Sequence, residues 1–164
     1  MLGKVDRVYG TSKTFRKEVE VRGELVTDID VEDSVAATLQ FASGAMGVWY
    51  ANWAVKANHS HTAIDGREGS LILQGNTMRL KSTRINDPDF IAGWHEITVN
   101  EPLLVDLHYR KIDHLVASIL DDTPLLLTGE DGRDALELVL GIYKSAETGR
   151  PVDLPMAREA LAAD

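Results

Sequence analysis

The segment that decides the fold is Val35–Trp53, which reads VAATLQFASGAMGVWYANW. Apolar side chains occupy every second position from Val35 to Phe41. Ser43-Gly44 then supplies a turn, and a second run with side chains alternating between two faces begins at Met46. Side chains two residues apart on a strand point to the same face of a sheet. The segment therefore predicts a β-hairpin.

Short alternating runs bounded by turn residues occur on both sides of this segment. Further strands are predicted at Val5–Thr11, Thr62–Asp65, Ser70–Leu73, Met78–Lys81 and Glu96–Val99. The turn signals Gly66-Arg67-Glu68-Gly69 and Gly75-Asn76 join three of these runs into an antiparallel meander. By contrast, Lys17–Asp30 is charged and weakly patterned, which predicts a loop or an edge of the sheet.

The periodicity becomes helical after Pro102. Residues then recur at helical spacing until Pro124 stops the pattern; they are His108, Ile112, Leu115, Val116 and Ile119. A second helix is predicted to begin after Thr128, whose hydroxyl can form a cap with Asp131, and to end at Gly149. Strands first and helices last predict a single α+β domain over residues 1–164, with an open-faced, mainly antiparallel β-sheet and helices packed on one face.

The strand that begins at Met46 is apolar on both faces. Trp49 and Trp53 point the same way, opposite to Met46, Val48 and Tyr50. A strand with large apolar side chains on both sides is normally buried on both sides. We therefore expect a homo-oligomer in which another subunit covers the sheet face, with Trp49 and Trp53 as the interface residues.

Composition limits the possible partners and location. The net charge of −9 argues against nucleic acid and an anionic membrane, because both call for clustered Lys and Arg. The absence of cysteine excludes disulfides, thiolate zinc sites and a cysteine nucleophile. No run of about 18 apolar residues and no signal-peptide core are present. We therefore expect a cytoplasmic protein that does not contact a membrane.

The polar residues before and within the meander are the candidates for a binding site. His59 and His61 share a strand face and could bind a metal ion, but no neighbouring pattern supplies a third ligand. Asn58 and His59 could instead present hydrogen-bonding groups to a polyhydroxylated substrate. Gly66 and Gly69 lie between two predicted strands, whereas a dinucleotide-binding loop leads from a strand into a helix. We predict no catalytic, cofactor-binding or metal-binding residue in this sequence.

Several segments resemble one known family in the same order. They are Val31–Val35, Phe41–Gly47, Ile64–Ser70, Pro124–Arg133 and Tyr143–Val152. In combination they resemble the C-terminal domain of Gfo/Idh/MocA-type oxidoreductases over nearly the whole chain. Leu2-Gly3-Lys4-Val5 resembles the junction that follows the family's catalytic helix. The resemblance implies that the chain begins just after that helix and lacks the N-terminal Rossmann domain.

This resemblance implies a function for the complete enzyme and a share of it for this chain. Family members transfer hydride between NAD(P) and sugars, polyols or related carbonyl compounds. The Rossmann domain would bind NAD(P), while this chain would supply part of the substrate pocket, with Asn58 and His59 as candidates, and the subunit contacts. An alternative is a stand-alone module that binds a small ligand or a protein and has lost dehydrogenase activity. A third hypothesis is a metal enzyme that uses His59 and His61.

Overall fold

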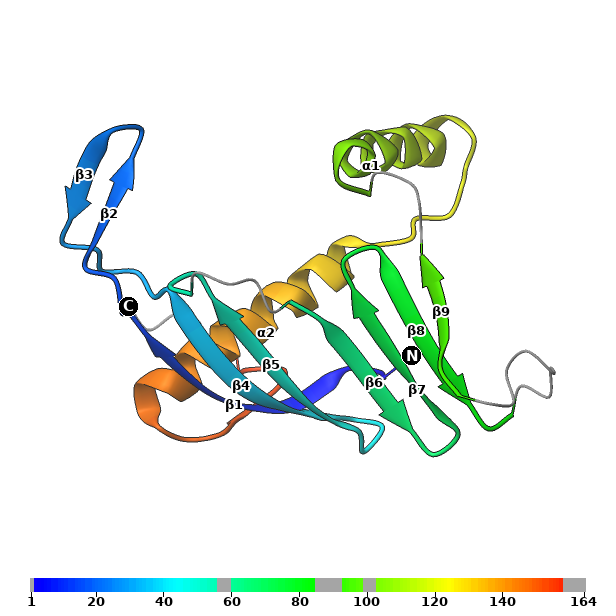
Figure 1. Cartoon of the computed structure of the whole chain (residues 1–164), viewed down its shortest axis with the longest axis horizontal. Helices are drawn as coiled ribbons and strands as arrows, with labels where there is room; N and C mark the ends of the chain where they lie inside the picture. The colour runs from blue at the N-terminus through cyan, green and yellow to red at the C-terminus, as the bar shows by residue number, and fades with distance from the viewer. Residues whose placement is uncertain (1, 56–59, 85–92, 99–102, 158–164) are drawn as a thin grey trace. The chain divides into compact units, whose positions relative to one another are not determined.

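The computed structural model describes residues 2–55, 60–84, 93–98 and 103–157 (Figure 1). The chain divides into two compact units, the first made of Met1–Lys56 and Leu126–Asp164 and the second of Ala57–Leu125. Mainly antiparallel strands and two helices make up the described residues. The predicted α+β class is confirmed.

The first unit is built on a four-stranded antiparallel sheet in the order β10-β1-β4-β5. Its strands are β1 (Val5–Lys13), β4 (Ser34–Phe41), β5 (Met46–Asn52) and β10 (Val152–Asp153). The predicted hairpin is confirmed in β4 and β5, where Ala37 lies opposite Trp49. The two-residue strand β10 was missed, because so short a strand leaves no pattern in the sequence.

A separate hairpin of β2 (Glu18–Val21) and β3 (Glu24–Thr27) is inserted between β1 and β4 (Figure 1). Of the two alternatives predicted for Lys17–Asp30, the loop is wrong, because the segment forms a two-stranded sheet in which both strands are edge strands. Arg22 and Gly23 both have positive φ, 54° and 85°, as in the type I′ turn that suits the twist of a two-residue hairpin. We refer to residues 14–33 as the hairpin arm.

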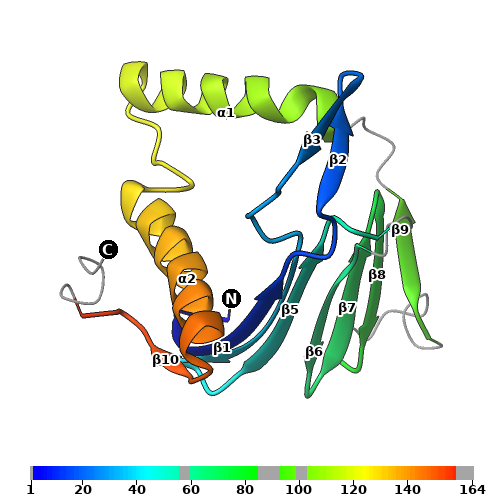
Figure 2. The same ribbon diagram turned by 90° about the vertical axis from the view of Figure 1, so that its left-hand side faces the viewer.

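Helix α2 (Gly129–Thr148) packs on one face of this sheet, chiefly against β1 (Figure 2). Val8, Val35, Ala37 and Ile142 form the buried core between the two layers. Gly10 permits the close approach, since a Cβ atom there would lie only 2.7 Å from Cγ2 of Ile142. The helix position is thus fixed by a small residue on the strand and a branched one on the helix.

Both ends of α2 have the predicted capping groups. The Thr128 hydroxyl accepts a hydrogen bond from the Asp131 N–H at 3.2 Å, and the Asp131 carboxylate accepts one from the Thr128 N–H at 2.7 Å. This capping box satisfies two amide groups that a helix start leaves unpaired. Gly149 ends the helix in the left-handed conformation, with φ of 64°.

The second unit contains an antiparallel sheet in the order β6-β7-β8-β9, and helix α1. The bounds are β6 (Thr62–Gly66), β7 (Gly69–Gln74), β8 (Thr77–Ser82), β9 (His95–Thr98) and α1 (Leu103–Leu120). Gly66 pairs with Gly69 across the β6–β7 turn, so the prediction of a hairpin rather than a phosphate loop is confirmed.

Helix α1 covers the predicted residues, but six of its apolar side chains between residues 108 and 120 are exposed. These side chains are Tyr109, Ile112, Leu115, Val116, Ile119 and Leu120. The prediction that helices pack on one face of a sheet is therefore confirmed for α2 and not for α1. His108 is exposed as well.

The close contact of β7 with β8 at Gly69 can be tested by substitution. A Cβ atom on Gly69 would lie 2.1 Å from the carbonyl oxygen of Lys81, so Gly69→Ala must displace the β8 main chain. We expect this substitution to lower the free energy of unfolding of the unit by about 1–3 kcal/mol. Urea unfolding followed by Trp94 fluorescence, in a chain that carries Trp49→Phe and Trp53→Phe, would measure it.

Gly66→Ala is the matched control. The nearest atom to a Cβ there is the Gly69 carbonyl oxygen at 3.7 Å, an ordinary contact distance. Equal unfolding midpoints for the two variants would contradict the predicted steric cause.

Candidate functional site

A pocket of about 250 Å³ opens in the first unit beside α2. Its lining comes from the end of the hairpin arm, the start of β4, the end of β5 with the residue that follows it, and the middle of α2: Glu32, Asp33, Ser34, Val35, Trp49, Ala51, Trp53, Val139, Ile142 and Tyr143. We call it the aromatic pocket. Val35 lies opposite Ala51 in the register, and Trp49 is two residues from Ala51 on the same strand. Because side chains alternate between the faces of a sheet, all three point to the face on which α2 packs.

The two tryptophans of this pocket are the predicted interface residues. Trp49 is 42% exposed and Trp53 is 80% exposed, on the side of the sheet that α2 covers in part. The open side of the sheet carries Met46, Val48 and Tyr50 instead, with Met46 and Val48 more than 80% exposed. An oligomer interface at Trp49 and Trp53 stays a prediction, and their position also makes them candidate ligand contacts.

A phenol and a carboxylate face each other at the pocket wall. The Tyr143 hydroxyl, on α2, donates a hydrogen bond to the Glu32 carboxylate. This hydrogen bond is the main reason that the pKa of Tyr143 is raised, with smaller contributions from burial and from the negative charge of Glu32. Tyr143 is therefore a neutral hydrogen-bonding group whose position Glu32 fixes.

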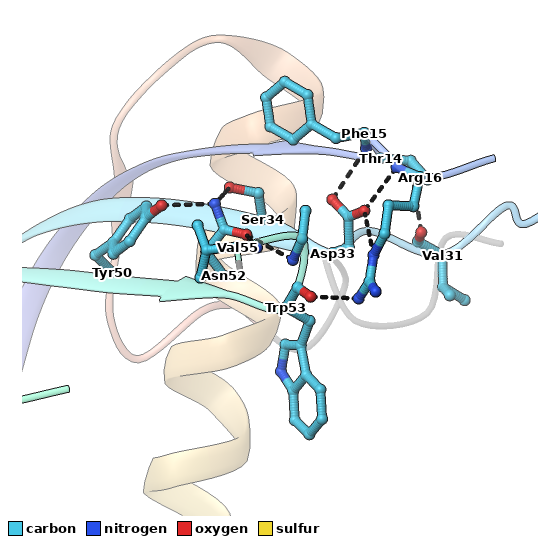
Figure 3. Close-up of polar contacts among 11 residues, drawn as sticks. Thr14, Phe15, Arg16, Val31, Asp33, Ser34, Tyr50, Asn52, Trp53 and Val55 are labelled. Atoms are coloured by element: carbon cyan, nitrogen blue, oxygen red, sulfur yellow. Dashed lines mark hydrogen bonds and ion pairs between the residues drawn. The ribbon is translucent and has the colours of Figure 1, made fainter. Parts of the chain in front are cut away.

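Asp33 lies at the base of the hairpin arm, where its carboxylate ties together two parts of the chain (Figure 3). One carboxylate oxygen accepts the Phe15 N–H at 2.9 Å, and the other accepts the Arg16 N–H at 2.8 Å. The hydrogen bond from Phe15 is the largest cause of the lowered pKa of Asp33, and the backbone N–H and charge of Arg16 act in the same direction. With its side chain only 11% exposed, Asp33 is held as a carboxylate.

Arg16 and Asn52 fix the chain where it leaves β5. The Arg16 guanidinium donates to the Trp53 carbonyl oxygen. The Asn52 amide donates to the Ser34 hydroxyl at 3.1 Å and accepts the Ala54 N–H at 2.7 Å (Figure 3). Side-chain to main-chain bonds of this kind are typical of asparagine in turns. The main chain around Trp53 is therefore ordered by polar contacts.

Sequence reasoning missed Arg16, Glu32, Asp33, Asn52 and Tyr143 as site residues. Asn52 at the end of a strand carried a usable turn signal. The other four come from the hairpin arm and from α2. Glu32 and Tyr143, which are in contact, are more than 100 residues apart in the sequence. No local pattern could have indicated that contact.

The predicted substrate residues Asn58 and His59 lie outside the described residues. His61, the other member of the candidate metal pair, is described and exposed. Within the described ranges, no group of three or more His, Asp or Glu side chains could hold a metal ion. In the same ranges, neither helix is long and apolar enough to cross a membrane.

The lowered pKa of Asp33 predicts the pH dependence of stability. A carboxylate whose pKa is lower in the folded state stabilises the fold above its unfolded pKa, near 3.8, and loses this effect as the pH falls through the folded value. We expect Asp33→Asn to lower stability near neutral pH and to flatten its acid dependence. Urea unfolding between about pH 3 and about pH 7 would measure this, with exposed Asp30→Asn as the control for a lost charge. Parallel pH curves for wild type and Asp33→Asn would contradict it.

Comparison with known proteins identifies the fold. A family model described as the C-terminal alpha/beta domain of the Gfo/Idh/MocA oxidoreductase family matches residues 1–154. A solved NAD-binding oxidoreductase from Klebsiella pneumoniae is 19% identical with a TM-score of 0.76, covering 94% of this chain and 46% of that one. A levoglucosan dehydrogenase in complex with NADH and L-sorbose gives the same identity, coverage and TM-score.

A third solved relative extends the similarity to a further enzyme. The aldose-aldose oxidoreductase from Caulobacter crescentus, complexed with glycerol, is 22% identical with a TM-score of 0.68, covering 93% of this chain and 42% of that one. The chain thus spans a little under half the length of these solved proteins. Because the family model covers nearly all of the chain, the chain belongs to the Gfo/Idh/MocA oxidoreductase family and corresponds to its C-terminal α/β domain.

Proposed function

We propose that this chain is the substrate-binding and oligomerisation domain of a cytoplasmic, NAD(P)-dependent oxidoreductase that acts on a sugar or polyol. The aromatic pocket carries the proposal, because Trp49, Trp53, Tyr143 and Glu32 line one cavity within one unit. Indole and phenol rings can stack on the C–H face of a sugar ring, while a carboxylate accepts hydrogen bonds from hydroxyl groups. Asn58 and His59 are proposed as further substrate contacts.

The cofactor would be bound elsewhere. Residues 1–164 contain no strand, glycine-rich loop and helix in succession, the unit that binds the pyrophosphate of a dinucleotide. A dinucleotide-binding domain, in a longer form of this polypeptide or in another chain, would hold NAD(P) and supply the hydride chemistry. A solved levoglucosan dehydrogenase of the same fold, in complex with NADH and L-sorbose, supports a complete enzyme that uses both a nicotinamide cofactor and a sugar.

The open face of the first sheet is the proposed subunit contact. Tyr9, Met46, Val48 and Tyr50 project from it and are between 47% and 83% exposed. Adjacent exposed apolar side chains on one sheet face mark a protein-binding surface more often than isolated ones do. A second copy of this chain could cover the face, because a symmetric dimer uses the same patch on both subunits.

Binding measurements test the substrate role. We expect titration of the chain with L-sorbose or glycerol to shift the indole N–H resonances of Trp49 and Trp53 but not that of Trp94. Tyr143→Phe should weaken the effect about tenfold, because it removes one hydrogen-bonding hydroxyl from the pocket. Titration with NADH, followed by energy transfer from tryptophan to the nicotinamide, should show no saturable binding to this chain alone.

Two results would contradict the proposal in different ways. Saturable binding of NADH would show that the chain has a cofactor site of its own. Failure of both L-sorbose and glycerol to shift either indole resonance would remove the substrate role. Tight binding of a ligand of another chemical class would favour a stand-alone binding module.

Charged substitutions on the two sides of β5 test the subunit contact. Val48→Glu places a carboxylate on the open face, at a side chain that is 82% exposed, so it should reduce the oligomer size without unfolding the chain. Trp53→Glu places the same charge on the side of α2 and is the matched control. Light scattering coupled to size-exclusion chromatography would measure both. A monomeric wild type would contradict the proposal, and dissociation by Trp53→Glu alone would place the interface at the tryptophans.

A further inference from the structure

The main chain of Trp53 is held on both sides by the hairpin arm. Its N–H donates to the Asp33 carbonyl oxygen at 2.7 Å, and its carbonyl oxygen accepts from the Arg16 guanidinium. Trp53 is 80% exposed, so side-chain packing restrains it little. The position of Trp53 at the aromatic pocket therefore depends on these two main-chain contacts.

Arg16 and Asp33 are in turn fixed to the base of the arm. The Asp33 carboxylate accepts the N–H groups of Phe15 and Arg16 where the chain leaves β1. The Thr14 hydroxyl donates to the Val31 carbonyl oxygen at 2.9 Å where the chain returns. These contacts close the base of the arm, and Arg16 reaches from it to Trp53 (Figure 3).

We propose that Arg16 and Asp33 are positioning residues of the aromatic pocket, which hold Trp53 in the pocket wall and connect the hairpin arm to it. Hydrogen bonds from a charged donor are stronger than neutral ones. The Asp33 carboxylate, on a side chain that is only 11% exposed, lies 3.9 Å from Nε of the Arg16 guanidinium and helps to keep it in place. The connection is local, because it involves one strand end and the base of one hairpin. It requires no particular ligand and so does not rest on the proposed function.

Hydrogen exchange measured by NMR on the full chain tests this role. Arg16→Ala should increase the exchange rate of the Trp53 amide about tenfold or more, because the Trp53 carbonyl oxygen loses its charge-assisted hydrogen bond and the main chain there is held less firmly. The amides of Leu39 and Ile142, in the core layers, should keep their wild-type rates. Arg16→Lys, which retains a positive donor, should restore part of the protection.

Lys17→Ala is the matched control, since it removes an exposed cation from the neighbouring position. Asp33→Asn is the second variant, because an amide cannot accept both N–H groups as the carboxylate does. It should also increase exchange at Trp53, while Lys17→Ala should not. Arg16 is 45% exposed, so its replacement leaves the core intact.

Fluorescence anisotropy provides an independent measurement. In a chain that keeps Trp53 alone, with Trp49→Phe and Trp94→Phe, Arg16→Ala should lower the anisotropy of the indole. A Trp53 amide that exchanges at the wild-type rate in Arg16→Ala would overturn the proposal. So would equal acceleration at Leu39 and Ile142, which would show a general loss of stability. A mobile Trp53 in a chain that binds no sugar would leave this inference intact and contradict only the proposed substrate role.

Discussion

The close approach of α2 to β1 is the constraint on which the rest of the first unit depends. Gly10 on the strand and Gly141 on the helix leave room for it, since a Cβ atom at Gly141 would lie 3.0 Å from Leu154 and 3.3 Å from Val8. The buried Ser145 hydroxyl accepts the Gly10 N–H and donates to the Arg150 carbonyl oxygen. Packing and hydrogen bonding thus fix the same point of contact.

The aromatic pocket follows from this contact. Once Ile142 is seated against β1, the next residue of α2, Tyr143, reaches Glu32 at the entry to β4. Strand alternation then places Trp49 on the side of the helix and leaves Val48 and Tyr50 on the open side. One strand therefore lines the aromatic pocket on one face and carries exposed apolar side chains on the other.

The polar cluster at the base of the hairpin arm has a different character from the core. Asp33 and Asn52 accept hydrogen bonds from main-chain N–H groups, and Arg16 donates one to a main-chain carbonyl oxygen. Such contacts order segments that have few apolar side chains to bury, because they satisfy backbone groups that no strand or helix pairs. An exposed residue such as Trp53 can in this way be held in place beside a pocket.

The sequence was sufficient to predict the family and most of the elements of regular structure. Alternation revealed the β4–β5 hairpin, and Thr128 with Gly149 marked the ends of α2, because these signals act between residues that are close along the chain. The arm hairpin was missed although Arg22-Gly23 stood at its turn, since its charged strands show no clear apolar face. The side of β5 that faces α2, and the contact of Tyr143 with Glu32, could not be predicted in this way. Those outcomes depend on the packing of segments far apart in the sequence, which local periodicity does not encode.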